Sequence, residues 1–258
     1  MNVAADPRLQ VIAAAHPQPL LFATISGAHL YGFPSPDSDF DLRGVHVLPL
    51  REVIGLVRGP ETIERMDATS GLDLDLVTHD VGKFVRLMRR PNGYVLEQLF
   101  SPLVVRTTPW HEELCALGRR CVTAAHVRHY LGFADTQWRL CCKEAPPRVK
   151  PLLYVYRVLL TGIHLLRTGE VQANLGVLNQ ATRLSHVDAL IARKTTGAEQ
   201  GVMAAAELPF HQREFERLVG ELRAAAATSP LPARLPVEVE RALHDFLVRV
   251  RLTPSAGG

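Results

Sequence analysis

The hydrophobic periodicity of this chain changes near its middle. From about residue 20 to residue 80, short apolar runs alternate with turn residues, a pattern typical of β-strands. Beyond about residue 108 the apolar residues recur at helical spacing, as in the stretch 150–169, which ends on a glycine. The sequence therefore predicts an α+β fold. Residues 1–108 would form a domain with a mixed β-sheet and helices, and residues 109–258 an all-helical domain.

The composition excludes several classes of protein. Of 258 residues, 47% are hydrophobic and 21% are charged, so the chain can bury a core and is not disordered. No apolar run approaches the roughly 18–20 residues of a membrane-spanning helix, and no basic stretch precedes the short apolar run near the N-terminus. The four cysteines match neither a disulfide framework nor a zinc site. We expect a cytoplasmic protein without a membrane partner.

The basic residues are divided unevenly between the two types. Arginine supplies 25 of the 29, and the formal net charge is only +3. Arginine forms bidentate contacts with phosphate, which makes it common at nucleotide sites. A GC-rich genome would produce the same bias, so the composition only hints at a phosphorylated ligand.

Two aspartates with alternating spacing open the strand predicted over residues 39–48. Because side chains alternate between the faces of a strand, Asp39, Asp41 and Arg43 share one face. Adjacent carboxylates repel one another unless a cation lies between them. Mg²⁺ prefers oxygen ligands, and it commonly binds carboxylates together with the phosphates of a substrate. We predict that Asp39 and Asp41 bind Mg²⁺, or Mn²⁺, and that Arg43 contacts a phosphate; the alternative is a merely polar turn.

A third carboxylate would complete a two-metal site. The strand predicted over residues 72–79 offers Asp73 and Asp75 on a common face. We favour Asp75, which is nearer the middle of the strand, and keep Asp73 as the alternative. Two metal ions held in this way stabilise the attacking and leaving oxygens of an in-line displacement. We expect the helices of this domain to cover the opposite face of the sheet.

A glycine turn lies about ten residues ahead of the first aspartate. Gly27 follows the buried strand predicted over residues 20–26 and precedes a short helical stretch. Backbone N–H groups at such a turn can bind phosphate. Neither a P-loop nor a dinucleotide-binding motif accounts for this glycine.

These motifs together resemble the DNA polymerase β-type nucleotidyltransferase superfamily. The matching residues are Ser26-Gly27-Ala28 and Asp39-Phe40-Asp41-Leu42. More narrowly, residues 26–45, 75–102 and 150–171 resemble the bacterial and phage family of RNA-repair-pathway (RlaP-like) nucleotidyltransferases. The resemblance implies transfer of a nucleoside monophosphate from a nucleoside triphosphate, such as ATP, to an acceptor hydroxyl, with release of pyrophosphate.

Four further side chains are candidate ligands of the nucleotide. The resemblance implies phosphate or base contacts from Lys150 and Arg157, two turns apart on one helix face, and Tyr154 between them would stack on a base. Lys83 lies one turn into the helix that Asp80 is predicted to cap, where it could reach a phosphate. Ordinary solvation or packing is the alternative for each.

The sequence departs from the superfamily pattern at one position. Ala28 stands where the superfamily has Gly or Ser, so the hydroxyl used on a terminal phosphate is missing there. His29 or Ser26 would have to replace it. This departure favours, as an alternative, a catalytically weak nucleotide-sensing or antitoxin-like module. For an active enzyme the family label favours an RNA end as acceptor; a protein side chain and a small molecule are the alternatives.

Overall fold

The computed structural model describes residues 3–67, 72–143, 145–196 and 201–253. The chain divides into two compact units: unit 1 comprises residues 1–27, 39–121 and 235–258, and unit 2 comprises residues 28–38 and 122–234. Each unit is thus assembled from segments that are far apart in the sequence. The two domains predicted from the sequence, residues 1–108 and 109–258, stay a prediction.

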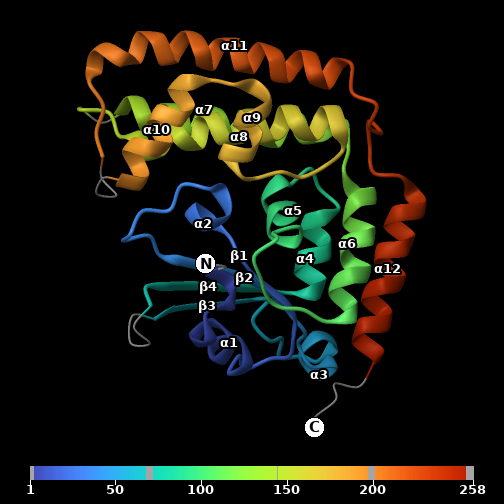
Figure 1. Cartoon of the computed structure of the whole chain (residues 1–258). Coiled ribbons are helices and arrows are strands. Elements are labelled where there is room, and N and C mark those ends of the chain that lie inside the picture. Colours follow the sequence, from blue (N-terminus) through green and yellow to red (C-terminus); the bar gives the residue numbers. More distant parts are fainter. Residues whose placement is uncertain (1–2, 68–71, 144, 197–200, 254–258) are drawn as a thin grey trace. The chain divides into compact units, whose positions relative to one another are not determined.

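Unit 1 contains a five-stranded mixed sheet, as predicted (Figure 1). Its strands are β1 (Leu20–Ile25), β2 (Phe40–His46), β3 (Thr62–Asp67), β4 (Leu74–Asp80) and β5 (Val104–Arg106). Their order is β3-β4-β2-β1-β5; β2 and β4 run parallel, and the other neighbouring pairs are antiparallel. Every residue of β1 is buried, which explains its continuous apolar run.

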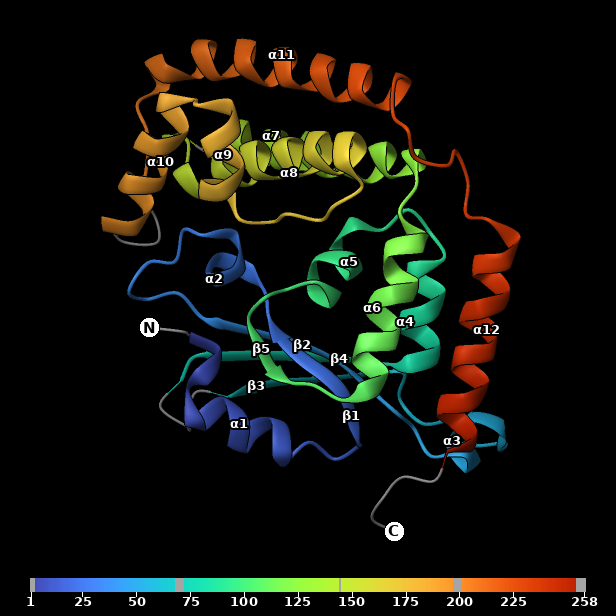
Figure 2. The same cartoon turned by 45° about the vertical axis from the view of Figure 1, so that its right-hand side comes forward.

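Helices cover both faces of this sheet (Figure 2). The helices of unit 1 are α1 (Pro7–Ala14), α3 (Leu50–Ile54), α4 (Val81–Met88), α5 (Gly93–Leu99), α6 (Pro109–Cys121) and α12 (Val237–Leu252). One core joins α1 to the face that carries Leu42 and Leu76. The other joins α4, α5, α6 and α12 to the face that carries Val45.

The second core corrects one expectation about the acidic face. By strand alternation, Val45 shares its face of β2 with Asp41 and Arg43. Because Val45 packs among residues of α4 and α6, those helices lie on the acidic face rather than opposite it. The carboxylates therefore occupy one end of a face whose other end is a packed core.

Unit 2 is built from helices, as predicted for the C-terminal part of the chain. They are α7 (Val127–Lys143), α8 (Val149–Thr168), α9 (Leu175–Thr182), α10 (Ser185–Thr196) and α11 (Leu208–Ala227), with the short helix α2 (Gly27–Tyr31) from the N-terminal part. Helix α8 is the centre of the unit and packs against α7, α9, α10 and α11. It ends at Gly169 in the left-handed conformation, with φ of 78°.

Helix α8 also corrects the expectation that no segment would be long and apolar enough to span a membrane. Among the described residues it is the one helix that meets both conditions, over 20 residues and with a mean hydropathy of 1.3. However, 83% of its apolar window is buried inside the protein. Such burial is typical of a core helix, which must also be apolar all round.

Candidate functional site

Two of the predicted aspartates come together at the start of β2. Asp41 and Asp75 are register partners on the neighbouring parallel strands β2 and β4. Their carboxylates converge on one atom, because Arg43 Nη2 lies 2.6 Å from Asp41 Oδ1 and 2.7 Å from Asp75 Oδ2. The repulsion expected between adjacent carboxylates is thus compensated by a cation, which in this structure is a side chain of the protein.

The guanidinium of Arg43 is held on every side. Besides the two carboxylates, it donates to the backbone carbonyl oxygens of Leu42 and Asp75 and, through Nε, to the hydroxyl of Tyr94 at 3.1 Å. Its five N–H groups thus all have acceptors. Burial by itself would lower the pKa of Arg43, but Tyr94, Asp75 and Asp41 outweigh that effect and raise the pKa. Arg43 is therefore a fixed charge, only 6% exposed.

Sequence reasoning missed Tyr94. This residue is the second of α5, more than fifty positions beyond Arg43, and it is 37% exposed. Asn92, which precedes α5, caps the helix by accepting from the backbone N–H of Tyr94. No pattern in the sequence links an aromatic residue in a helix to a strand residue so far away, so no sequence signal could have identified it.

Gly27 provides the surface on which the Asp41 carboxylate lies. Its φ is +58°, in the left-handed region, and a Cβ placed on Gly27 would fall 1.7 Å from Asp41 Oδ2. The backbone N–H of Ser26 donates to the carbonyl oxygen of Asp41 at 2.8 Å and fixes this approach. Only glycine satisfies both the conformation and the contact. Gly27 and Asp41 are separated in the sequence, but they lie directly against each other in the structure.

The hydroxyl of Ser26 has no hydrogen-bond partner among the described residues, although it is buried. Serine at 1% exposure normally satisfies its hydroxyl with a protein group, water or a ligand. Ser26 is also one of the residues predicted to compensate for Ala28. By contrast, α2 is only five residues long, so its dipole adds little to phosphate binding here.

The other two predicted aspartates lie just outside the strands. Asp39 is half-buried and precedes β2 by one residue; Asp73 is exposed and precedes β4 by one residue. The backbone carbonyl oxygen of Asp73 accepts from the N–H of Phe40. Of the two candidates for the third carboxylate, Asp75 is the one that the register places opposite Asp41.

The donor set of Asp41 and Asp75 fits a hard divalent cation. Carboxylate oxygens are the ligands that Mg²⁺ and Mn²⁺ prefer, and these two converge on the position of one cationic nitrogen. In the part of the chain that the structure describes, no group of three or more His, Cys, Asp or Glu side chains is arranged to hold a metal. The structure therefore assembles two carboxylate ligands with Arg43 between them, and leaves Asp39 apart.

Lys83 is placed away from these carboxylates. Asp80 caps α4 as predicted, accepting from the N–H of Gly82, and the ammonium of Lys83 donates to the hydroxyl of Thr62. Thr62 is the register partner of His79, four residues along β4 from Asp75. At about 3.3 Å per strand residue, His79 and Asp75 lie roughly 13 Å apart along β4. The structure does not bring Lys83 into the acidic site.

The remaining predicted residues belong to unit 2. Ala28 and His29 are in α2, and Lys150, Tyr154 and Arg157 are in α8. The Arg157 guanidinium is 2% exposed and lies over the ring of Tyr31, 3.9 Å from its centroid. Tyr154 packs edge-on to the same ring at 5.5 Å. Two of the three helix candidates thus join one aromatic cluster, and this packing contact was not predicted.

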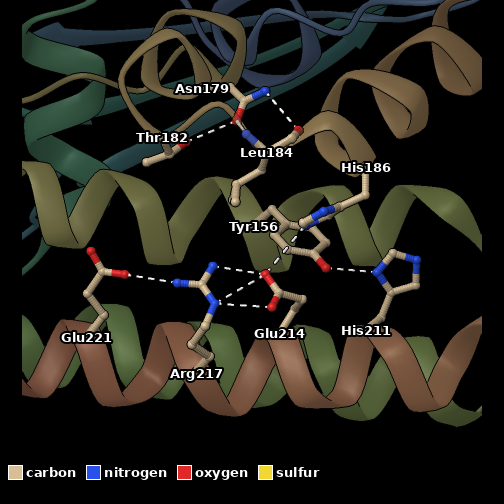
Figure 3. A network of polar contacts seen from close by, with 9 residues as sticks. All are labelled: Tyr156, Asn179, Thr182, Leu184, His186, His211, Glu214, Arg217 and Glu221. Atoms are coloured by element: carbon tan, nitrogen blue, oxygen red, sulfur yellow. Dashed lines mark hydrogen bonds and ion pairs between the residues drawn. The ribbon is translucent and has the colours of Figure 1, made fainter.

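A second polar network joins three helices of unit 2 (Figure 3). The hydroxyl of Tyr156 in α8 lies 2.8 Å from Nδ1 of His211 in α11, and Arg217 donates to Glu214 at 2.9 Å. His186 of α10 faces Glu214 at 3.7 Å. Burial lowers the pKa of His186 and of His211, which favours the neutral imidazole of each. The network joins these helices through polar contacts.

Comparison with known proteins identifies relatives over most of the chain. Residues 1–249 match the family described as RlaP, RNA repair pathway DNA polymerase beta family. The uncharacterized protein MJ0002 of Methanocaldococcus jannaschii is 32% identical over 158 residues, 60% of this chain and 63% of that protein. The uncharacterized protein YcgL of Bacillus subtilis is 25% identical over 210 residues, 78% of this chain and 80% of that protein. This chain therefore spans less than two thirds of the archaeal relative.

Proposed function

The chain belongs to the RlaP family, the RNA repair pathway DNA polymerase beta family, and from that premise we propose that it is a metal-dependent nucleotidyltransferase. The observation that carries the proposal is the convergence of Asp41 and Asp75 on a single cationic atom, at 2.6 and 2.7 Å. A pair of carboxylates on neighbouring strands, compensated by a cation, is the arrangement that a divalent metal would use.

The reaction is transfer of a nucleoside monophosphate. An acceptor hydroxyl attacks the α-phosphorus of a nucleoside triphosphate and forms a new O–P bond. The bond to the bridging oxygen breaks, and pyrophosphate leaves. A bound Mg²⁺ or Mn²⁺ supplies charge neutralisation on the triphosphate and on the attacking oxygen.

Each residue of the site has a role in this proposal. Asp41 and Asp75 would hold the metal, Asp39 would join them only on metal binding, from its position one residue before β2, and Asp75 would also accept the proton of the acceptor hydroxyl. Ser26 donates its buried hydroxyl to a phosphate oxygen, in the place of the hydroxyl that Ala28 lacks. The buried oxygen of this hydroxyl has no hydrogen-bond partner among the described residues, which supports that role.

The acceptor is proposed from the family alone. An RNA end is favoured because the family is described by RNA repair. Transfer to a protein side chain or a small molecule, and nucleotide sensing without turnover, are outcomes that the following experiment separates.

The test supplies each α-³²P-labelled nucleoside triphosphate, with Mg²⁺ or Mn²⁺, together with RNA, protein or small-molecule fractions of a cell extract. We expect label to move to one fraction and pyrophosphate to be released. Binding of nucleotide without pyrophosphate release from any fraction would replace the enzyme with a sensor. No binding and no transfer would contradict the proposal altogether.

Matched variants assign the third carboxylate. Asp75→Asn should reduce transfer by about three orders of magnitude or more, because proton acceptance and metal charge compensation are both lost. Asp73→Asn is the control, because Asp73 is exposed and contacts Phe40 through its backbone carbonyl oxygen rather than its carboxylate. Equal losses in the two variants would contradict the assignment of Asp75.

Ser26→Ala tests the proposed phosphate contact separately. We expect a higher KM for the triphosphate by roughly ten-fold, from the loss of one hydrogen bond to a charged group. The stability of the protein should be unchanged, since the hydroxyl has no partner among the described residues. An unchanged KM would leave Ser26 out of the site.

A further inference from the structure

Arg43 occupies the position that a shared metal ion would need. Its Nη2 contacts Asp41 Oδ1 and Asp75 Oδ2 at 2.6 and 2.7 Å. A Mg²⁺ ion bound to the same two oxygens would lie about 2.1 Å from each. The two cations cannot both bind this pair of oxygens, so Nη2 has to leave at least one of them when a metal enters.

Leaving the carboxylates is unfavourable for Arg43 unless another acceptor arrives. Three of its five N–H groups donate to neutral acceptors: the Tyr94 hydroxyl and the carbonyl oxygens of Leu42 and Asp75. The two N–H groups of Nη2 donate to the carboxylates alone. A buried N–H without an acceptor destabilises the protein, particularly on a charged group.

A free metal ion and a metal–nucleotide complex differ in what they offer Arg43. The free ion brings only water and a positive charge that repels the guanidinium. The complex brings phosphate oxygens, which accept from a guanidinium in the same forked geometry as a carboxylate. Exchange of partners by Arg43 is therefore favourable with metal and triphosphate together, and unfavourable with the metal alone.

Building on the proposed function, we propose that Arg43 makes metal binding depend on nucleotide binding. Before substrate arrives, Arg43 takes the place of the metal and holds Asp41 and Asp75 together. When the metal–triphosphate complex enters, the rigid guanidinium turns as a unit, and Nη2 exchanges carboxylate oxygen for phosphate oxygen. Arg43 is thus a positioning residue that prevents uptake of metal without substrate.

The test measures Mn²⁺ binding by the loss of the free-ion EPR signal. The protein is titrated alone and with the α,β-methylene analogues of ATP, GTP, CTP and UTP in turn, and an analogue-only titration corrects for Mn²⁺ bound in solution. In the wild type we expect Mn²⁺ to bind roughly ten- to a hundred-fold more tightly with one analogue than alone, the effect of removing a like charge from a shared site.

Arg43→Gln removes the charge and keeps a side chain of similar length. We expect this variant to bind Mn²⁺ alone roughly ten-fold or more tightly than the wild type does, and to lose most of the dependence on nucleotide. Arg86→Gln is the matched control in the same unit, because Arg86 forms an exposed ion pair with Glu61. It should bind Mn²⁺ as the wild type does.

If Arg43→Gln fails to fold, as judged by circular dichroism, Arg43→Lys is measured in its place. Lysine keeps the charge, so Mn²⁺ alone should still bind weakly. Its ammonium lacks the guanidinium fork, so the tightening by nucleotide should fall several-fold. A lysine variant with wild-type dependence on nucleotide would overturn the proposal.

The outcomes separate this inference from the proposed function. If the wild type binds Mn²⁺ neither alone nor with any analogue, both are overturned. If it binds Mn²⁺ tightly alone, and Arg43→Gln changes neither that affinity nor its dependence on nucleotide, only the role of Arg43 is overturned.

Discussion

Replacement of Gly27 by alanine is the most specific perturbation of the acidic site. A Cβ at this position would lie 1.7 Å from Asp41 Oδ2, and the backbone has φ of +58°. The left-handed conformation costs a non-glycine residue about 1–2 kcal/mol. The carboxylate must also rotate away, which weakens its half-buried bond to Arg43 and costs about 1–3 kcal/mol more. Gly27→Ala should therefore destabilise unit 1 by about 2–5 kcal/mol.

The chain offers a separate fluorescent reporter for each unit. It has two tryptophans, Trp110 in α6 of unit 1 and Trp138 in α7 of unit 2. In a Trp138→Phe background, urea unfolding followed by fluorescence reports on the surroundings of Trp110. The shift in the urea midpoint, multiplied by the slope of the transition, gives the change in the free energy of unfolding.

Gly132→Ala is the control, measured through Trp138. Gly132 lies within α7, and no atom of the described residues, apart from its own helix backbone and chain neighbours, would come within 4 Å of an added Cβ. Alanine should stabilise this helix by up to about 1 kcal/mol, since it loses less conformational freedom on folding. The reasoning is refuted if Gly27→Ala changes the free energy of unfolding by less than about 0.5 kcal/mol, or if both variants are equally destabilised.

Three further predictions concern stability. Asp80→Asn should lower the free energy of unfolding by about 3–5 kcal/mol, because the 2%-exposed carboxylate of Asp80 pairs with an arginine of α12. Glu61→Gln, at an exposed ion pair, should lower it by less than about 1 kcal/mol in the same urea assay. Burial lowers the pKa of His126 to about 4 from 6.5, so the unfolded state binds more protons between these values. Unit 2 should therefore lose up to about 3 kcal/mol as the pH falls from 6.5 to 4, and an unchanged urea midpoint for the unit 2 reporter between pH 7 and 4.5 would contradict this. Tyr31→Leu removes the ring beneath Arg157 and should destabilise unit 2 by about 1–2 kcal/mol, whereas no change in that midpoint would show that the stacking contributes nothing.

Local patterns in the sequence were sufficient to predict several parts of the fold. Strand alternation placed Asp41 and Arg43 on one face, and the structure has them in contact. The caps at Asp80 and Gly169 were predicted because each depends on residues within one or two turns. These features involve neighbours along the chain, so periodicity and residue type are enough to identify them.

The composition of each unit was decided by tertiary structure. Residues 28–38 belong with the helices of unit 2, and residues 235–258 belong with the sheet of unit 1. A sequence read in order favours a single boundary, since periodicity carries no information about which distant segments pack together. The long apolar helix α8 shows the same limit: its sequence does not distinguish a membrane span from a core helix, and only its burial does.

The acidic site shows most clearly what the sequence determined and what it did not. The sequence by itself determined which carboxylates were available and that Asp41 and Arg43 lie on the same side of a strand. The pairing of β2 with β4 placed Asp75 opposite Asp41, and the packing of α5 brought Tyr94 to Arg43. Register between strands more than thirty residues apart depends on the whole core. Tertiary structure therefore decided that an arginine, rather than open solvent, lies between the two aspartates.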